Sequence, residues 1–156
     1  MRMITLPLCA IALVACAKTE KAPAVDTTTP PPAMAAAPAK LSLADVAGKW
    51  SVKTMNQAGD TTLLTYELTA TADTAGWTIK FADRKNTIPA HVMADGDSVI
   101  MDAGPYPSAL RKGVQVTIHG ASRLVDGKLV GMTTAHYSVK TADSVRVLKM
   151  EGTRMP

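Results

Sequence analysis

Residues 61–70 read TTLLTYELTA, and along this stretch apolar and polar side chains alternate. Leu64, Tyr66 and Leu68 fall on one face of an extended chain, while the residues between them, Thr65 and Glu67, fall on the other. A period of two residues is typical of a strand with one buried face. Similar alternation returns in GWTIKF at residues 76–81 and in VQVTIH at 114–119. These stretches predict an all-β domain.

Turn residues separate the alternating stretches. Asp95-Gly96 and Asp126-Gly127 are two-residue hairpin signals, because Asp and Gly tolerate the positive φ of a type I′ turn. Looser turns are expected at 56–60, 72–76, 83–87 and 141–144. The strands predicted between these turns are 48–55, 61–71, 76–81, 87–94, 97–103, 114–123, 127–139 and 144–153.

Short connections throughout imply that neighbouring strands pair in antiparallel fashion. Eight consecutive antiparallel strands close most economically into an up-and-down barrel, which removes exposed edges. An open sandwich is the alternative arrangement. Before the first strand, Ser42 to Asp45 resembles a capping box and predicts one short helical turn. The longest break in the strand pattern is residues 103–113, where Tyr106 lies between two prolines.

The barrel domain is assigned to residues 41–156, which hold all the aromatic residues of the chain. The whole chain has a formal net charge of +4, and four basic and two acidic residues precede residue 41, which leaves the domain at +2. These charges are scattered along the sequence, and only Arg84-Lys85 and Arg111-Lys112 form pairs, both in expected turns where they are interpreted as solvated. A nucleic-acid-binding protein shows a concentrated basic face instead, so no nucleic-acid partner is expected.

The N-terminal segment 1–15 has the plan of an export signal: Arg2 is followed by an apolar run that is too short to span a bilayer. Leu13-Val14-Ala15-Cys16 ends the run and resembles the lipobox of bacterial lipoproteins. That resemblance implies cleavage before Cys16, a diacylglyceryl thioether on its sulfur and acylation, for example with palmitate, of the new N-terminus. It also implies a membrane partner, held through this lipid.

Other interpretations of the segment are ordinary secretion, with Ala15-Cys16-Ala17 as an A-x-A cleavage signal, and an uncleaved anchor. The following residues, 16–40, are rich in Ala, Pro and Thr and are expected to form a disordered linker. In two-membrane cells, aspartate after the lipidated cysteine is the familiar signal for inner-membrane retention. Ala17 therefore favours an outer membrane location, facing the periplasm.

Gly48-Lys49-Trp50 on the first predicted strand resembles the G-x-W motif of the lipocalin and calycin barrels. In that family the tryptophan fills the closed end of the barrel, and a basic residue of the last strand packs over it. The resemblance implies this structural role for Gly48, Trp50 and Arg154. The sequence departs from the family at Ser51, where an aromatic often follows, and the domain is shorter than a typical lipocalin.

Catalytic and metal-binding signals are weak. The domain has no cysteine, no G-x-S-x-G, no H-E-x-x-H and no glycine-rich phosphate loop, so it is not expected to be an enzyme or to hold a cofactor. His91, His119 and His136 are on different predicted strands without the local spacing of a metal motif, and His119 is expected to face solvent. No metal site is predicted.

Two functions remain open: a barrel that binds a small apolar ligand, and a packed barrel that docks another envelope protein. The residues expected to face inward are Trp50, Val52, Tyr66, Leu68, Trp77, Ile79, Phe81, Val114, Val116, Ile118 and Tyr137. Small residues elsewhere on the strands, such as Ala70, Ala90, Gly131 and Ala135, favour a modest cavity at the end away from Trp50, with residues 103–113 beside its mouth. The candidate ligand-binding residues are Tyr66, Trp77, Tyr106 and Tyr137.

Overall fold

The structure is a computed structural model that describes residues 40–156. The predictions about the signal segment, Cys16 and the linker up to residue 39 lie outside the described residues. A short helix precedes eight strands: α1 (Leu43–Val46), β1 (Gly48–Met55), β2 (Thr62–Ala70), β3 (Thr78–Phe81), β4 (Ile88–Asp95), β5 (Ser98–Pro107), β6 (Gln115–Val125), β7 (Lys128–Tyr137) and β8 (Val145–Arg154).

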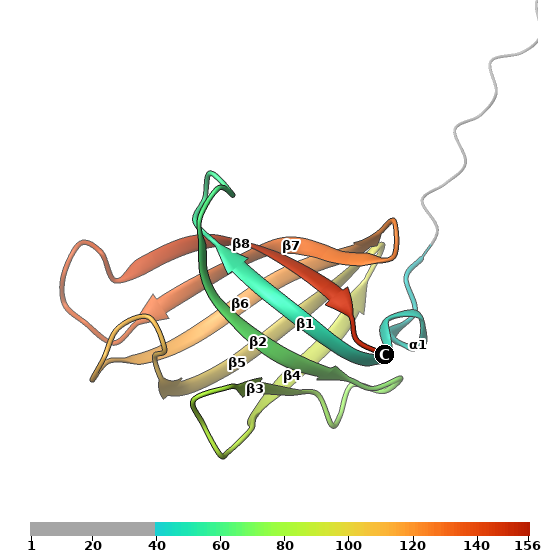
Figure 1. Cartoon of the computed structure of the whole chain (residues 1–156), viewed down its shortest axis with the longest axis horizontal. Helices are drawn as coiled ribbons and strands as arrows, with labels where there is room; N and C mark the ends of the chain where they lie inside the picture. The colour runs from blue at the N-terminus through green and yellow to red at the C-terminus, as the bar shows by residue number, and fades with distance from the viewer. Residues whose placement is uncertain (1–39) are drawn as a thin grey trace, which may run out of the picture. The chain divides into compact units, whose positions relative to one another are not determined.

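The eight strands form a closed barrel in sequence order (Figure 1). Each strand pairs with the next in antiparallel fashion, and β8 pairs with β1 to close the ring, with Trp50 opposite Arg154. The predicted eight-stranded up-and-down barrel is therefore confirmed, and the open sandwich is excluded. Within the described residues, no helix has the length and apolar character needed to cross a bilayer.

Strand boundaries agree with the prediction to within two residues, except at the end of β5. The sequence placed a long break at 103–113, whereas β5 continues to Pro107 and the connection to β6 spans only 108–114. The β5–β6 register shifts between Ala103 and Tyr106, and Tyr106 then pairs with Val116. This irregularity accommodates Gly104 and Pro105 inside the strand, so their presence did not end it.

The helix α1 begins where the capping box predicted. The Ser42 hydroxyl accepts a hydrogen bond from the Ala44 amide, and the Asp45 carboxylate accepts one from the Ser42 amide. Leu43 and Val46 bury the apolar side of this turn against the barrel core. In Figure 1, α1 lies at one end of the barrel, beside the start of β1 and the C-terminus.

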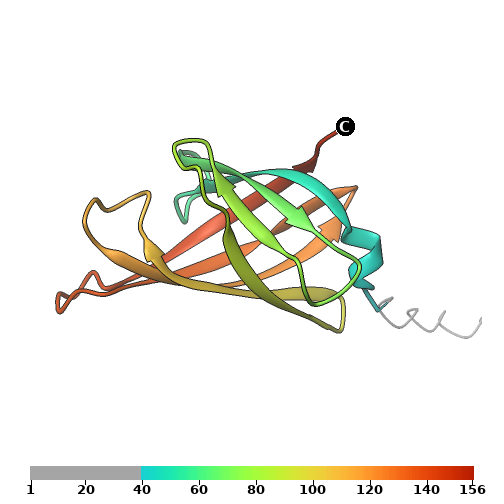
Figure 2. The ribbon, with the colours of Figure 1, turned by 90° about the horizontal axis from the view of Figure 1, so that it is seen from below.

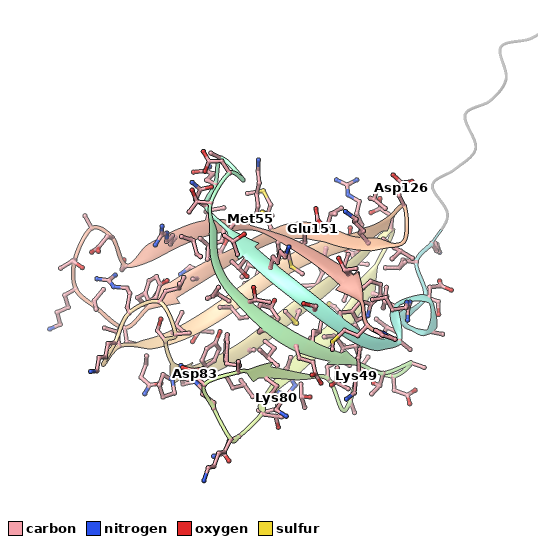
Figure 3. The ribbon with its side chains drawn as sticks, viewed as in Figure 1. Lys49, Met55, Lys80, Asp83, Asp126 and Glu151 are labelled. Carbon is pink, nitrogen blue, oxygen red and sulfur yellow. The ribbon has the colours of Figure 1, made fainter. Side chains whose placement is uncertain are left out.

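The interior is filled mainly by the alternating apolar residues of all eight strands. The residues predicted to face inward are buried, except Val114, which is only partly buried. The opposite faces carry polar residues: Lys49 of β1 forms an ion pair of 3.4 Å with Glu67, which lies opposite Lys80 of β3. Figure 3 labels Lys49 and Lys80 on this outer surface. Alternation therefore sets which side chains form the core.

Candidate functional site: an apolar cavity at the open end

The two ends of the barrel differ. We call the end with α1 and the loops 71–77, 96–97 and 126–127 the helical end, and the end with the loops 56–61, 82–87, 108–114 and 138–144 the open end. Figures 1 and 2 both show loops 108–114 and 138–144 on the side away from α1. A small cavity lies between the strands at the open end.

The cavity has a volume of about 40 Å³ and opens to solvent. Its aromatic walls are Tyr66, Phe81, Tyr106 and Tyr137, and its aliphatic walls are Leu64, Ile79, Ala109, Leu110, Val116, Ile118, Ala135 and Leu148. The polar residues that line it are Thr54, Ser108 and Thr133. The cavity is thus an apolar hollow with a few hydroxyl groups, which suits the apolar part of a small molecule.

Three aromatic rings form a connected wall across β2, β3 and β5. The Tyr66 and Phe81 rings meet edge to face with 5.6 Å between their centroids, and the Phe81 and Tyr106 centroids lie 6.0 Å apart. This geometry is in the range where aromatic pairs add stability beyond their buried area. The wall is consequently held in place before any ligand arrives.

Burial changes the acidity of two tyrosines in this wall. Burial raises the pKa of Tyr66 far above its ordinary value near 10, with a smaller contribution from nearby Tyr106. Burial likewise raises the pKa of Tyr106 to about 12, against the opposing effect of the Arg84 charge. Both phenols are therefore neutral at physiological pH, and they present hydroxyl groups rather than negative charges to the cavity.

Arginines flank the cavity on both sides. The Arg84 guanidinium lies 4.9 Å from the centroid of the Phe81 ring, and the Arg111 guanidinium lies 4.9 Å from that of Tyr137. Arg111 also pairs with the Asp143 carboxylate at 3.0 Å and donates to the Asp143 carbonyl oxygen at 3.0 Å. These contacts join the β5–β6 loop to the β7–β8 loop at the mouth.

The structure brings together three of the four candidate ligand-binding residues. Tyr66, Tyr106 and Tyr137 line the cavity, whereas Trp77 lies outside its lining. Trp77 is buried beside the β2–β3 loop, where its indole N–H donates to the Asp73 carbonyl at 2.8 Å. Alternation predicted its inward direction, but it does not say at which end of the barrel a residue lies.

Sequence reasoning did not name the residues that complete the site. Leu110 of the β5–β6 loop covers the cavity, Thr133 places a hydroxyl in its wall, and Arg84 lies beside it. The sequence pairs Arg84-Lys85 and Arg111-Lys112 were interpreted as solvated turn residues. The predicted strand order could have shown that both pairs lie at the same end, because every second loop of an up-and-down barrel is at that end.

The helical end is closed by Trp50. Its buried indole N–H donates to the Val46 carbonyl at 2.8 Å, and the Arg154 guanidinium lies 4.4 Å from the centroid of its ring. Arg154 also donates to the carbonyl oxygens of Ala47 and Asp45. Gly48, with φ of +133°, leaves room for Arg154, because a Cβ there would come within 2.7 Å of the guanidinium.

The three histidines lie on the outer surface of the barrel. His91, His119 and His136 are all exposed, and the His119 Nδ1 lies 2.7 Å from the Asp102 carboxylate. In residues 40–156, no three His, Cys, Asp or Glu side chains come together in a way that could hold a metal ion. The described part of the chain thus offers the apolar cavity as its candidate site.

Comparison with protein-family models, with curated proteins and with solved structures gave no match. The functional argument therefore depends on the geometry of the chain itself.

Proposed function

We propose that this protein is a lipid-anchored lipoprotein of the cell envelope whose barrel binds a small apolar ligand at the open end. The observation that carries the ligand-binding proposal is the apolar cavity walled by Tyr66, Phe81, Tyr106 and Tyr137. Its hydroxyl groups provide directional contacts, and its aromatic wall provides apolar area. The proposal involves no chemical step, so no catalytic residue is assigned.

The size of the cavity limits the ligand. Pockets for drug-sized ligands usually have volumes of about 300 to 1,000 Å³, whereas this cavity measures about 40 Å³. Only the end of a molecule, such as a short alkyl chain, fits inside without movement of side chains. The remainder lies in the open mouth, against Leu64 and Leu110, which are only partly buried.

An environment-sensitive apolar dye tests ligand binding. We expect the folded barrel to bind one equivalent of dye, and Tyr66→Ala and Tyr137→Ala to change the dye affinity by several-fold while the domain stays folded. Val125→Ala, an exposed position on the outer surface at the helical end, is the control that should leave the affinity unchanged. Dye binding that arises only after partial denaturation would count against the proposal.

The lipid anchor is proposed on the residues that precede the domain. Leu13 to Cys16 matches the lipobox pattern, and Ala17 favours residence in the outer membrane, with the barrel in the periplasm. Cys16→Ser should abolish membrane retention and leave precursor or soluble protein, because serine has no thiol to form the thioether. Radiolabelled palmitate should enter the wild-type chain and not the variant; absence of label from the wild type would refute the anchor.

One observation favours the alternative of a packed barrel that docks another envelope protein. The cross-strand register places Met93, Ile100, Ala121 and Met132 in one row across β4 to β7, with Met93 58% and Met132 43% exposed. Flexible methionines are common at protein-binding surfaces. A cavity of only 40 Å³ is also compatible with a barrel filled by its own side chains. The dye experiment separates the two functions.

A further inference from the structure

Charge is distributed unequally between the two ends of the barrel. The four loops of the open end contain five basic residues (Arg84, Lys85, Arg111, Lys112, Lys140) and three acidic ones (Asp60, Asp83, Asp143). The three loops of the helical end contain three acidic residues (Asp73, Asp97, Asp126) and no basic residue. Figure 3 labels Asp126 at the helical end and Asp83 toward the open end. The loops around the mouth of the cavity are therefore net positive, whereas the loops of the helical end are net negative.

Arg84 is the mouth arginine best placed to meet a ligand. Its side chain is only 21% exposed, and its guanidinium is held against the Phe81 ring of the cavity wall. A second hollow, lined by Arg84, Lys85, Asn86, Ile88, Tyr106 and Pro107, adjoins the cavity and shares Tyr106 with it. An apolar cavity and a hollow lined partly by basic and amide residues thus share one residue, Tyr106.

Arg84 and Arg111 differ in how closely a carboxylate of the protein pairs with each of them. Asp143 lies 3.0 Å from Arg111, which also donates to the Asp143 carbonyl oxygen, whereas the Asp83 carboxylate is 3.9 Å from the Arg84 Nε. The two carboxylates are similarly exposed, at 69% and 71%, so the longer distance and the single contact leave more of the Arg84 charge available. The anionic group of a ligand that extends from the cavity past Tyr106 would contact Arg84 and Lys85 rather than the Arg111–Asp143 ion pair.

We infer that the ligand of the open end is a small amphiphile with one anionic group: its apolar end occupies the tyrosine-walled cavity, and its anion lies against Arg84 and Lys85. This inference rests on the proposed apolar-ligand function and adds the charge of the ligand. The phenols of Tyr66 and Tyr106 are neutral and so do not repel the anion. Recognition of a carboxylate by a guanidinium is favoured further by bidentate hydrogen bonding.

Two probes with the same apolar body test the inference: 4-butylbenzoate, which is anionic, and 4-butylbenzyl alcohol, which is neutral. Their butyl chains suit the narrow cavity, and calorimetry or NMR titration of the barrel measures both affinities. At low salt we expect the benzoate to bind at least about fivefold more tightly than the alcohol. Added salt should reduce this difference in affinity, because a partly exposed charge contact is screened.

Arg84→Gln should reduce the benzoate affinity to near that of the alcohol and leave alcohol binding unchanged. Arg123→Gln is the matched control, because Arg123 is 62% exposed on the outer face and pairs with Asp97 at 3.7 Å at the other end. Should Arg84→Gln alter folding, Lys85→Gln with the same salt series provides the second variant, with a smaller loss in benzoate affinity expected.

The outcomes separate the two proposals. Equal affinities for the two probes in the wild type, or equal losses in Arg84→Gln and Arg123→Gln, would overturn the anionic inference and leave apolar binding intact. Binding of neither probe would overturn the proposed function itself. A third outcome is that the barrel attaches to anionic vesicles while Arg84→Gln keeps the preference for benzoate over the alcohol. That outcome would assign the basic loops to contact with a membrane surface, and it would also overturn the inference.

Discussion

At the scale of single residues, Arg154 connects three parts of the helical end. Its guanidinium covers the Trp50 ring at 4.4 Å and donates to the carbonyls of Ala47 and Asp45 at the end of α1. A four-residue helix has too few internal hydrogen bonds to satisfy its own carbonyl groups. Arg154 supplies donors to two of these carbonyls, Trp50 supplies one to Val46, and the Arg154 guanidinium also covers the indole ring.

Arg154→Met tests this role, because methionine keeps apolar area but has neither charge nor donors. We expect the free energy of unfolding to fall by about 1 to 2 kcal/mol, the usual range for cation–π and charge-assisted contacts combined. Urea unfolding followed by tryptophan fluorescence measures the change. Arg123→Met, which removes only an exposed ion pair, should cost less than about 0.5 kcal/mol. Equal effects of the two variants would contradict the role assigned to Arg154.

At the scale of elements, alternation and turn chemistry predicted strands and faces but not every local detail. The eight strands follow from side-chain period and turn residues, and the helical turn before them follows from the Ser42–Asp45 capping box; all of these are local signals. The continuation of β5 past Gly104 and Pro105 depends on pairing of Tyr106 with Val116 across the sheet, which is a long-range contact. The position of Trp77 at the helical end follows from strand order instead, because β1 and β3 start at the same end of an up-and-down barrel. Alternation by itself predicts neither feature.

Gly131 in β7 shows how closely the strands approach. A Cβ at this position would lie 2.1 Å from the Ala121 carbonyl oxygen and 2.7 Å from the Ser122 Cα, both in the backbone of β6. Gly131→Ala should therefore separate β6 from β7 and lower the free energy of unfolding by about 2 kcal/mol or more, in the range of overpacking mutations. Hydrogen exchange of β6 and β7 amides should quicken with it.

Gly120→Ala is the comparison for that prediction. Its added Cβ would meet the Thr133 hydroxyl at 3.2 Å, and a side chain yields more readily than backbone. The expected loss is below about 1 kcal/mol, because only a small adjustment relieves the contact. If the two alanine variants lost similar amounts of stability, the close approach of β6 and β7 at Gly131 described above would be wrong.

At the scale of the whole molecule, the barrel combines a closed helical end, a filled middle and an open end where apolar and basic surfaces meet. Trp50 and Arg154 close the first, and the tyrosine-walled cavity beside Arg84 occupies the last. Because strands of a barrel connect alternately at opposite ends, residues far apart in sequence, such as Arg84 and Arg111, reach the same mouth. Along the sequence the two arginines are in separate turns, and only the order of the strands in the barrel brings them to the same end.

The buried tyrosines make the stability of the whole barrel depend on pH in the alkaline range. An unfolded tyrosine titrates near pH 10, whereas burial raises the folded pKa of Tyr106 to about 12 and that of Tyr66 further. Below pH 10 both states keep the phenol protonated, so this contribution to stability is complete. Above pH 10 the unfolded chain releases protons that the native barrel retains, and the free energy of unfolding falls by about 1.4 kcal/mol per pH unit for each such tyrosine.

Urea unfolding of the wild type, Tyr66→Phe, Tyr106→Phe and the double variant between pH 8 and 11.5 measures this dependence. Lysine titration contributes equally to all four proteins, so differences in slope isolate the two phenols. We expect the steepest loss of stability in the wild type, a shallower one in each single variant and the shallowest in the double variant. Phenolate absorbance at about 295 nm should show the same two groups titrating above the ordinary range near pH 10 while the barrel is folded. Identical slopes in the four proteins would mean that Tyr66 and Tyr106 are open to water, and the tyrosine wall of the cavity would then not be closed as described.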